Sequence, residues 1–276
     1  MAVNHQHGDL DLTRIFSTFA NQWSMNNQGC AGTLFYLIDD KSIQEFSYSN
    51  EFAIVYDAPV EQVKINPLST LSYQNITNSF TDQSVLFSIE TPIIESWEET
   101  SCVCPGGTSF TNIPPPNRNV PGLPASDSAS LTHDLVETHS FTNTWNINQS
   151  IRLPPRSSTK VTFQTKLKEV KQNFEITFWL TGHIGVLSMH PINGNTEHYF
   201  PITEILQQVD SNQFTLDMEV NKVTAFVTGI YKATYQVEPQ LLIQTQNLDN
   251  PTIVQESILD LNTGNKILVN KSNGCC

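Results

Sequence analysis

The stretch that decides the fold runs from Val85 to Trp97 and reads VLFSIETPIIESW. Its odd positions include Phe87, Ile89 and Ile93 as well as both ends, and its even positions include Ser88, Glu90 and Ser96. This period of two is the pattern of a β-strand, in which successive side chains point to opposite faces. The stretch exceeds the usual strand length of about five or six residues. We therefore predict a long strand with one apolar face.

A second alternating run spans residues 129 to 151 and carries serine and threonine along its polar face. Because compact sandwiches rarely need two strands of this length, the pair favours an elongated molecule. An ordinary long β-sandwich with a polar outer face is the alternative that the pattern leaves open. The apolar positions of this run are Leu131, Leu135, Phe141, Trp145, Ile147 and Ile151, and the polar ones are Ser130, Thr132, Thr138, Ser140, Thr142 and Thr144.

The segment between the two runs, residues 104 to 126, contains six prolines. Proline cannot donate a backbone hydrogen bond to a neighbouring strand, so this segment is not expected to form a central strand. Val103, Phe110 and Ile113 supply apolar side chains at its edge and within it, but without strict alternation. The regular strand pattern therefore belongs to the two flanking runs.

The remainder of the chain predicts one helix and several shorter strands. Apolar residues recur at spacings of three and four between Asp11 and Trp23, which is the stripe of an amphipathic helix. Residues 182 to 208 are rich in histidine and are expected to be irregular. The fold class is therefore mainly β, with a short N-terminal helix. The other expected strands are Thr33–Ile38, Phe52–Tyr56, Val63–Ile65, Lys160–Lys168, Phe174–Leu180, and two around Gly229, Val223–Tyr235 and Pro239–Gln246.

The charge of the chain limits its partners. It carries 27 acidic and 14 basic residues, which give a net charge of -13. This charge opposes binding to nucleic acid and to anionic lipid headgroups, so action on a membrane is expected to need a specific receptor. No run of about eighteen apolar residues predicts a transmembrane helix. The first nine residues are polar and are not expected to belong to a signal peptide.

The sequence shows no pattern of a catalytic or metal site. It lacks a phosphate-binding loop, a zinc-protease motif and a serine-hydrolase motif. His183, His190, Glu197 and His198 occur close together, but their spacing fits no ligand motif. The five cysteines form an odd, clustered set and are expected to be mostly free thiols. We therefore predict that the protein is not an enzyme and has no metal or other cofactor.

A family resemblance appears in the residues that end the second run and follow it. The sequence reads WNINQ over Trp145–Gln149 and IRLPPR over Ile151–Arg156, followed by Lys160-Val161. This segment resembles the aerolysin-like β-pore-forming toxins of the epsilon-toxin and mosquitocidal-toxin branch, and in particular their small insecticidal crystal members. The opening helix and the threonine- and asparagine-rich segment Leu71–Val85 are similar as well, so the likeness extends loosely over most of the chain.

The resemblance implies an elongated aerolysin-like fold with long antiparallel strands, and a soluble or inclusion-body protoxin without a signal peptide. Such a toxin is activated by trimming of its termini, binds a receptor, oligomerises and inserts one β-hairpin per protomer into a membrane-spanning β-barrel. The expected partners are a glycan, lipid or protein receptor on the target cell and further copies of the chain. The residues expected in the inserting hairpin are Val85, Phe87, Ile89, Ile93, Trp97, Val103, Phe110, Ile113, Leu131, Leu135, Phe141 and Trp145.

The chain departs from the family in the proline-rich segment, which replaces a tongue of alternating apolar and small polar residues. The flanking strands are therefore expected to form the barrel wall. We expect residues 1–67 with 182–210 to form a receptor-binding head, and residues 68–181 with 211–261 a β-rich stem whose inserting hairpin lies within 85–147. Residues 262–276 are expected to be a removable C-terminal tail. A cation-preferring lumen is predicted from the acidic residues Glu90, Glu95, Glu98, Glu99, Asp134 and Glu137.

A non-lytic lectin or adhesin is the alternative function, because an acidic β-rich protein with clustered aromatic residues can bind sugars by stacking. Both functions share a receptor-binding step. They differ in whether the serine- and threonine-rich strands leave their soluble packing on a membrane. The candidate receptor contacts are Trp23, Tyr36, Tyr48, Trp179, His190, Tyr199 and Phe200.

Overall fold

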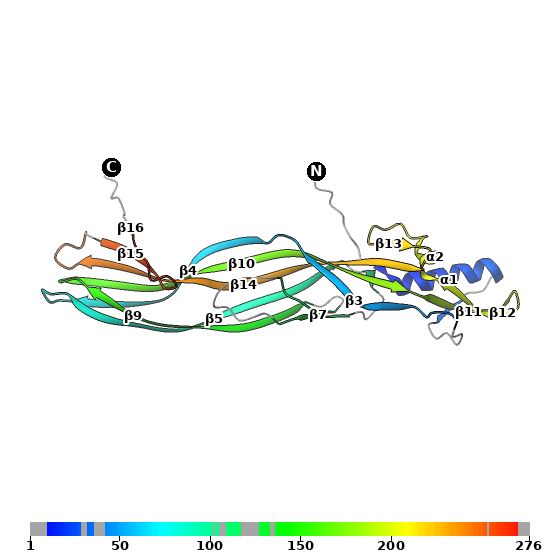
Figure 1. Ribbon diagram of the computed structural model, residues 1–276, viewed down its shortest axis with the longest axis horizontal. Helices are drawn as coiled ribbons and strands as arrows, with labels where there is room; N and C mark the ends of the chain where they lie inside the picture. The colour runs from blue at the N-terminus through cyan, green and yellow to red at the C-terminus, as the bar shows by residue number, and fades with distance from the viewer. Residues whose placement is uncertain are drawn as a thin grey trace, which may run out of the picture.

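The computed structural model describes residues 10–28, 32–35, 42–101, 103–104, 109–116, 127–132, 136–252 and 254–269. The molecule is elongated, its long strands run along its longest axis, and both described helices, α1 (Leu12–Gln28) and α2 (Ile202–Leu206), lie at one end (Figure 1). The predictions of a mainly β, elongated fold with an N-terminal helix are confirmed. Three residues named above, Tyr36, Asp134 and Leu135, lie outside the described part of the chain, as do four of the five cysteines, Cys30, Cys102, Cys275 and Cys276.

The described strands form one large sheet, called the main sheet below, and three small ones. The large sheet contains β3 (Ser47–Tyr56), β4 (Val60–Asn75), β5 (Thr81–Ser101), β9 (Glu137–Leu153), β10 (Ser157–Thr181), β13 (Phe214–Asp217), β14 (Lys222–Asn247), β15 (Val254–Asp260) and β16 (Lys266–Val269). The small sheets are β1 (Leu10–Asp11) with β6 (Val103–Cys104), β7 (Ser109–Ile113) with β8 (Ala129–Thr132), and β2 (Thr33–Phe35) with β11 (His183–Ile192) and β12 (Asn195–Pro201).

Strands β10 and β14 pair along almost their whole length and form the centre of the main sheet. The sequence predicted two strands in place of each, and that prediction is wrong. Pro239 is accommodated at a bulge, where it and Glu238, with φ of 53°, lie opposite Thr165 alone. Gly229 lies inside the continuous strand β14. A Cβ atom at this position would lie 2.1 Å from the ring of Phe174, so a larger residue would clash with that ring. This glycine therefore permits close packing inside a continuous strand.

Strands β5 and β9 form a long antiparallel hairpin, in unbroken register from Thr81 opposite Leu153 to Trp97 opposite Glu137. The long strand predicted from residue 85 is confirmed. The second run, predicted as one strand from residue 129 to 151, is divided instead, because β8 pairs with β7 and only β9 pairs with β5. Leu131 therefore belongs to the short β7–β8 pair and not to the long hairpin.

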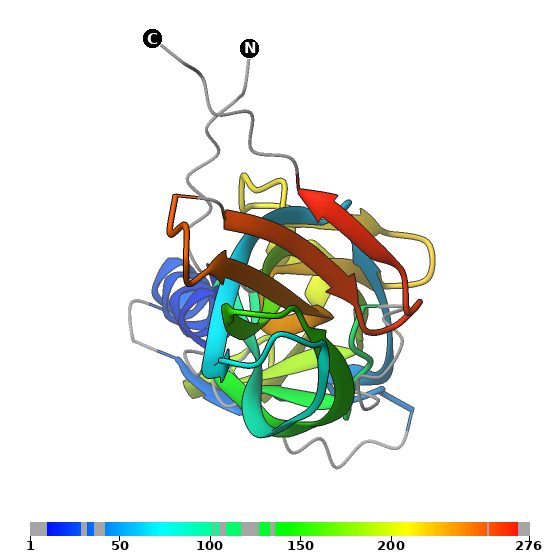
Figure 2. The ribbon, with the colours of Figure 1, turned by 90° about the vertical axis from the view of Figure 1, so that its left-hand side faces the viewer.

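The β5–β9 hairpin folds over β10 and β14 and encloses two hydrophobic cores against them. Beyond residue 94, β5 also pairs with β14, so the hairpin is joined to the main sheet by backbone hydrogen bonds at that level. In one core Phe87 stacks on Phe163 of β10, and in the other Trp97 contacts Tyr231 of β14. Figure 2 looks along the long axis and shows β15 and β16 on the side of the molecule opposite this hairpin.

The end of the molecule that carries α1 also contains the β11–β12 hairpin. The sequence predicted an irregular segment from residue 182 to 208, and that prediction is wrong, since most of these residues are in β11, β12 and α2. The turn between the two strands is Asn193-Gly194, and both residues have positive φ, 51° and 86°. An Asn-Gly pair is the strongest short-range signal for a two-residue hairpin turn, and it was the signal that the sequence interpretation overlooked.

Strand β16 lies within the C-terminal residues that were expected to form a removable tail. It pairs antiparallel with β15, from Val269 opposite Glu256 to Lys266 opposite Leu259. β15 in turn pairs with β14. Residues up to Val269 are therefore part of the main sheet.

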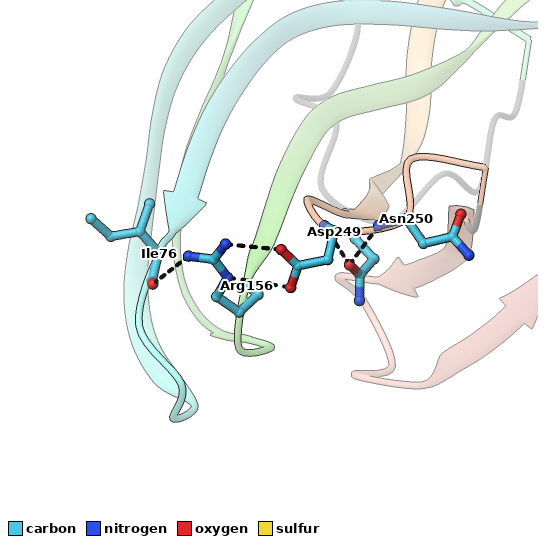
Figure 3. A network of polar contacts seen from close by, with 5 residues as sticks. Ile76, Arg156, Asp249 and Asn250 are labelled. Atoms are coloured by element: carbon cyan, nitrogen blue, oxygen red, sulfur yellow. Dashed lines mark hydrogen bonds and ion pairs between the residues drawn. The ribbon is translucent and has the colours of Figure 1, made fainter.

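The loops at the end opposite α1 are joined by Arg156, the last residue of the IRLPPR motif (Figure 3). Its guanidinium Nη2 lies 2.8 Å from Oδ1 of Asp249, its Nε donates to Oδ2 of the same carboxylate at 3.3 Å, and its Nη1 donates to the carbonyl of Ile76 at 3.4 Å. The residue has φ of 47° and its backbone N–H donates to Thr77. One side chain thus connects the β4–β5, β9–β10 and β14–β15 loops.

This contact predicts a pH dependence. The hydrogen bond from Arg156 holds the pKa of Asp249 below its ordinary value, so the pair stabilises the fold above the unfolded-state pKa of about 3.9 and loses this effect as pH falls through the folded-state pKa. We expect Arg156→Gln to raise the pKa of Asp249 toward its ordinary value, as measured by carboxyl NMR titration. A carboxyl titration unchanged by the substitution would contradict this pairing.

Candidate functional site

The apolar face of the β5–β9 hairpin is directed into the molecule. Val85, Phe87, Ile93 and Trp97 are buried, and Ile89 is half-buried. Along β9, Phe141 and Trp145 are half-buried and pack against the same two cores. The predicted inserting residues of these two strands therefore share one face, and the main sheet shields that face from water.

The other face of the hairpin is largely exposed and mostly polar, with Leu86 and Ile94 as exposed apolar exceptions. Ser84 Oγ donates to Asn148 at 3.3 Å and Ser88 Oγ donates to Asn146 at 3.0 Å, so hydroxyl and amide groups form rungs between the strands. Neutral hydroxyl and amide groups can face water, and they can also be buried in hydrogen-bonded pairs without the cost of burying a charge. The two strands therefore carry most of their apolar side chains on one face and most of their polar side chains on the other.

The acidic residues divide between these two faces. Glu90 and Glu98 occupy even positions on the polar face, whereas Glu95, Glu99 and Glu137 occupy odd positions on the apolar face. Glu95 is fully buried. A lumen formed by the polar face would thus receive its negative charge from Glu90 and Glu98 and not from the buried carboxylate.

Glu95 ties the hairpin to the centre of the main sheet. Its Oε1 accepts a hydrogen bond of 2.6 Å from the hydroxyl of Tyr231 on β14. Beside it, the indole N–H of Trp97 donates to the hydroxyl of Tyr56 at 3.1 Å, and burial raises the pKa of Tyr56 to about 12. Lys232 on β14 forms an ion pair with Glu98 at 2.6 Å. The sequence did not predict this cluster, because Glu95 and Tyr231, like Glu98 and Lys232, are more than a hundred residues apart in the chain.

Tyr231→Phe is expected to lower the free energy of unfolding by about 1–3 kcal/mol, because the buried carboxylate of Glu95 loses a hydrogen-bond donor. Urea denaturation measures this loss. In a Glu95→Gln background the same substitution should cost less, since a neutral amide is cheaper to leave short of a donor. Equal stability of the wild type and Tyr231→Phe would show that this hydrogen bond contributes nothing.

The apolar residues near the proline-rich segment are also buried. Val103, Ile113 and Leu131 are fully buried, and the ring of Phe110 contacts Phe178 at 5.2 Å in the core beside the hairpin. Tyr56 donates a hydrogen bond to the carbonyl of Pro114 at 2.9 Å. These predicted inserting residues therefore fill the core next to the hairpin, on separate short strands.

The aromatic residues proposed as receptor contacts fall into two groups. One group lies on α1 and β12, where the ring centroid of Trp23 is 4.9 Å from that of Phe200 and 4.5 Å from that of His198. On the same strand, the hydroxyl of Tyr199 donates a hydrogen bond to the carboxylate of Glu197. The other group comes from the main sheet and β11. There Tyr48 on β3 is exposed, Trp179 on β10 lies beneath the ammonium of Lys222 at 4.4 Å, and His190 on β11 is exposed.

Solved structures are similar to this chain over most of its length. No protein-family model matches the chain, and no curated protein matches it. A chain of the Cry23Aa1 and Cry37Aa1 binary complex is similar with a TM-score of 0.60 and 13% identity, over 95% of this chain and 98% of that one. The Mpp75Aa1.1 beta-pore-forming protein from Brevibacillus laterosporus is similar with a TM-score of 0.52 and 13% identity, over 95% and 98%. The protein has an aerolysin-like fold.

The aerolysin-like fold is not confined to active toxins. A non-toxic crystal protein from Bacillus thuringiensis is similar with a TM-score of 0.56 and 14% identity, over 87% of this chain and 98% of that one. At these identities the likeness establishes the fold, and the activity has to be argued from the residues of this chain.

The described residues of this aerolysin-like fold form neither a membrane-spanning helix nor a metal cluster. None of the described helices is long and apolar enough to cross a membrane. Within the same part of the chain, no three His, Cys, Asp or Glu side chains are grouped so that they could hold a metal ion. His198 directs Nε2 to the backbone carbonyl of Asn195 at 3.1 Å, and Nδ1 of His183 lies 3.0 Å from the carbonyl of Gln44. Two of the clustered histidines, His183 and His198, therefore direct a ring nitrogen to a backbone carbonyl.

Proposed function

We propose that the protein is a pore-forming toxin that binds a cell-surface receptor, oligomerises and inserts the β5–β9 hairpin of each copy into a transmembrane β-barrel. The observation that carries this proposal is the hairpin itself, in which a mainly apolar, buried or half-buried face and a mainly polar, exposed face run along two strands in unbroken register. A barrel strand needs about ten such residues, with one face toward lipid and one toward water. The hairpin meets this requirement without any change of register.

The proposal assigns a role to each part of the molecule. The head, residues 1–67 with 182–210, recognises the receptor, and the stem, residues 68–181 with 211–261, stores the hairpin. Proteolytic trimming of the C-terminal tail is proposed to act beyond Val269, because removal of Lys266–Val269 would break the β15–β16 pairing. The resemblance of the sequence to small insecticidal crystal toxins supports insect cells as the first targets.

Dye release from insect cells or receptor-bearing vesicles, with and without brief trypsin treatment, tests this function. We expect release together with a large, heat-resistant oligomer on gels. Tight binding to cells without release or oligomer would instead support a non-lytic lectin. The protein is not proposed as an enzyme.

The charge on the polar face predicts the ion preference of the pore. Glu90 is exposed and lies opposite Thr144 within the hairpin, so each protomer would place this carboxylate in the lumen. The wild-type pore is expected to prefer cations, and Glu90→Lys should shift the reversal potential toward anion preference. Thr144→Ser is the control on the paired strand and should leave the potential unchanged. An anion-selective wild-type pore would contradict this assignment.

A further inference from the structure

A cleft in the head lies beside α1, and its lining contains none of the aromatic residues proposed as receptor contacts. It is formed by β1, by one side of α1 from Arg14 to Gln22 and by α2 with the residues that follow it, and its volume is about 400 Å³. Figure 1 shows α1 and α2 next to each other at this end of the molecule. A volume of this size is within the range of small-molecule sites.

The floor of the cleft is apolar and its rim is polar. Ile205 is buried and Ile15 and Phe19 are half-buried along the floor. The ring of Phe19 contacts Phe200 at 5.0 Å, edge to face, which limits the orientations that this ring can take. The floor therefore offers a fixed aromatic and aliphatic surface on which the C–H face of a ring can pack.

The rim has hydrogen-bonding groups that the fold does not use. The side chains of Arg14, Gln22 and Gln208 line the cleft and make no hydrogen bond or ion pair with any residue that the structure describes. The hydroxyl of Thr18 donates to a backbone carbonyl at 2.8 Å and keeps its acceptor capacity. One carboxylate oxygen of Asp11 accepts the N–H of Arg14 at 3.0 Å, which leaves the other oxygen for a ligand.

The charge and the mixture of donors and acceptors select the class of ligand. The lining contains one acidic and one basic side chain, Asp11 and Arg14, whereas phosphate and sulfate groups are bound by clustered cations or bidentate arginine pairs. Each hydroxyl of a sugar both donates and accepts, and each glutamine amide provides both functions. We propose that this cleft binds a neutral saccharide of one or two rings, presented at the end of a cell-surface glycan.

The biological role of this site rests on the proposed function, because a bound glycan would serve as the receptor on the target cell. The cleft assigns recognition to the polar flank of α1. Trp23 and Phe200 instead pack against each other on α1 and β12. Trp23 and Phe200 would then fix the position of the helix, and Gln22 and Gln208 would form hydrogen bonds with the sugar.

Binding of methyl glycosides of glucose, galactose, mannose, N-acetylglucosamine and N-acetylgalactosamine to the full chain tests the proposal, by saturation-transfer NMR and titration calorimetry. We expect at least one of them to bind. Gln22→Ala combined with Gln208→Ala should weaken that binding at least about tenfold, because hydrogen bonds on both sides of the cleft are lost. Asn21→Ala, an exposed amide next to Gln22 but outside the cleft, should leave the affinity unchanged.

The outcomes separate this inference from the proposed function. Dye release by a wild type that binds none of the neutral glycosides, or that binds only sialylated or sulfated glycans on an array, would overturn the cleft and leave pore formation intact. Sugar binding that the double substitution does not weaken would also overturn it. Sugar binding that the double substitution removes, in a protein that releases no dye, would support the cleft and remove the pore.

Discussion

The double variant Ile94→Cys with Thr234→Cys is expected to lose dye release in oxidising buffer and to recover it on reduction. Ile94 of β5 lies directly opposite Thr234 of β14. Residues opposed in this way have Cα atoms about 4.5–5.5 Å apart, which suits a disulfide bond. Such a bond would hold the hairpin on the main sheet, and insertion requires the hairpin to leave it.

The matched control places a disulfide inside the hairpin. Ser88 of β5 lies opposite Asn146 of β9, on the exposed face. Ser88→Cys with Asn146→Cys should therefore retain release in oxidising buffer, because the two strands move together. Intact mass after alkylation shows whether the intended bond has formed beside the native cysteines. Full release by the oxidised Ile94 and Thr234 variant would mean that the β5–β9 hairpin stays on the sheet.

Ile89→Lys is expected to abolish pore formation while the protein remains folded. Ile89 is at the centre of the apolar positions that run from Val85 to Ile93, and it is only half-buried in the soluble fold. A lysine facing lipid near the bilayer midplane costs about 2–4 kcal/mol, and every protomer of the barrel would bear this cost. Dye release and the heat-resistant oligomer assay measure the loss.

The neighbouring position provides the control for this substitution. Ser88 is exposed and belongs to the polar face, so Ser88→Lys adds the same charge where the barrel meets water. We expect this variant to keep its ability to release dye, with a lower preference for cations. If the two lysine variants behave alike, the assignment of the faces is wrong. Circular dichroism of both variants shows whether the soluble fold is retained.

Sequence patterns predicted the faces of the hairpin better than its boundaries. Alternation identified β5 and the polar face of β9, because each side chain of a strand reports its own face. The same patterns divided β10 and β14 wrongly, since Pro239 and Gly229 are turn residues in most settings. In this fold a bulge receives Pro239 and the ring of Phe174 occupies the space that Gly229 leaves open.

The candidate site could be predicted only in part for a similar reason. The apolar residues of the hairpin are visible in the sequence, but the cleft beside α1 is not. Its polar rim joins Gln22 to Gln208, and neither residue belongs to a motif. Exposed glutamines are ordinary surface residues, so they indicate a site only when folding brings them to one cavity.

The sequence by itself determined a mainly β, elongated protein with a long amphipathic hairpin, because periodicity and length are local properties of a strand. Only the tertiary structure decided where that hairpin is stored and what holds it. Glu95 and Tyr231 are 136 residues apart and meet because β5 pairs with β14. Local patterns cannot specify such a pair, since the choice of partner strand depends on the free energy of the whole sheet and its two cores.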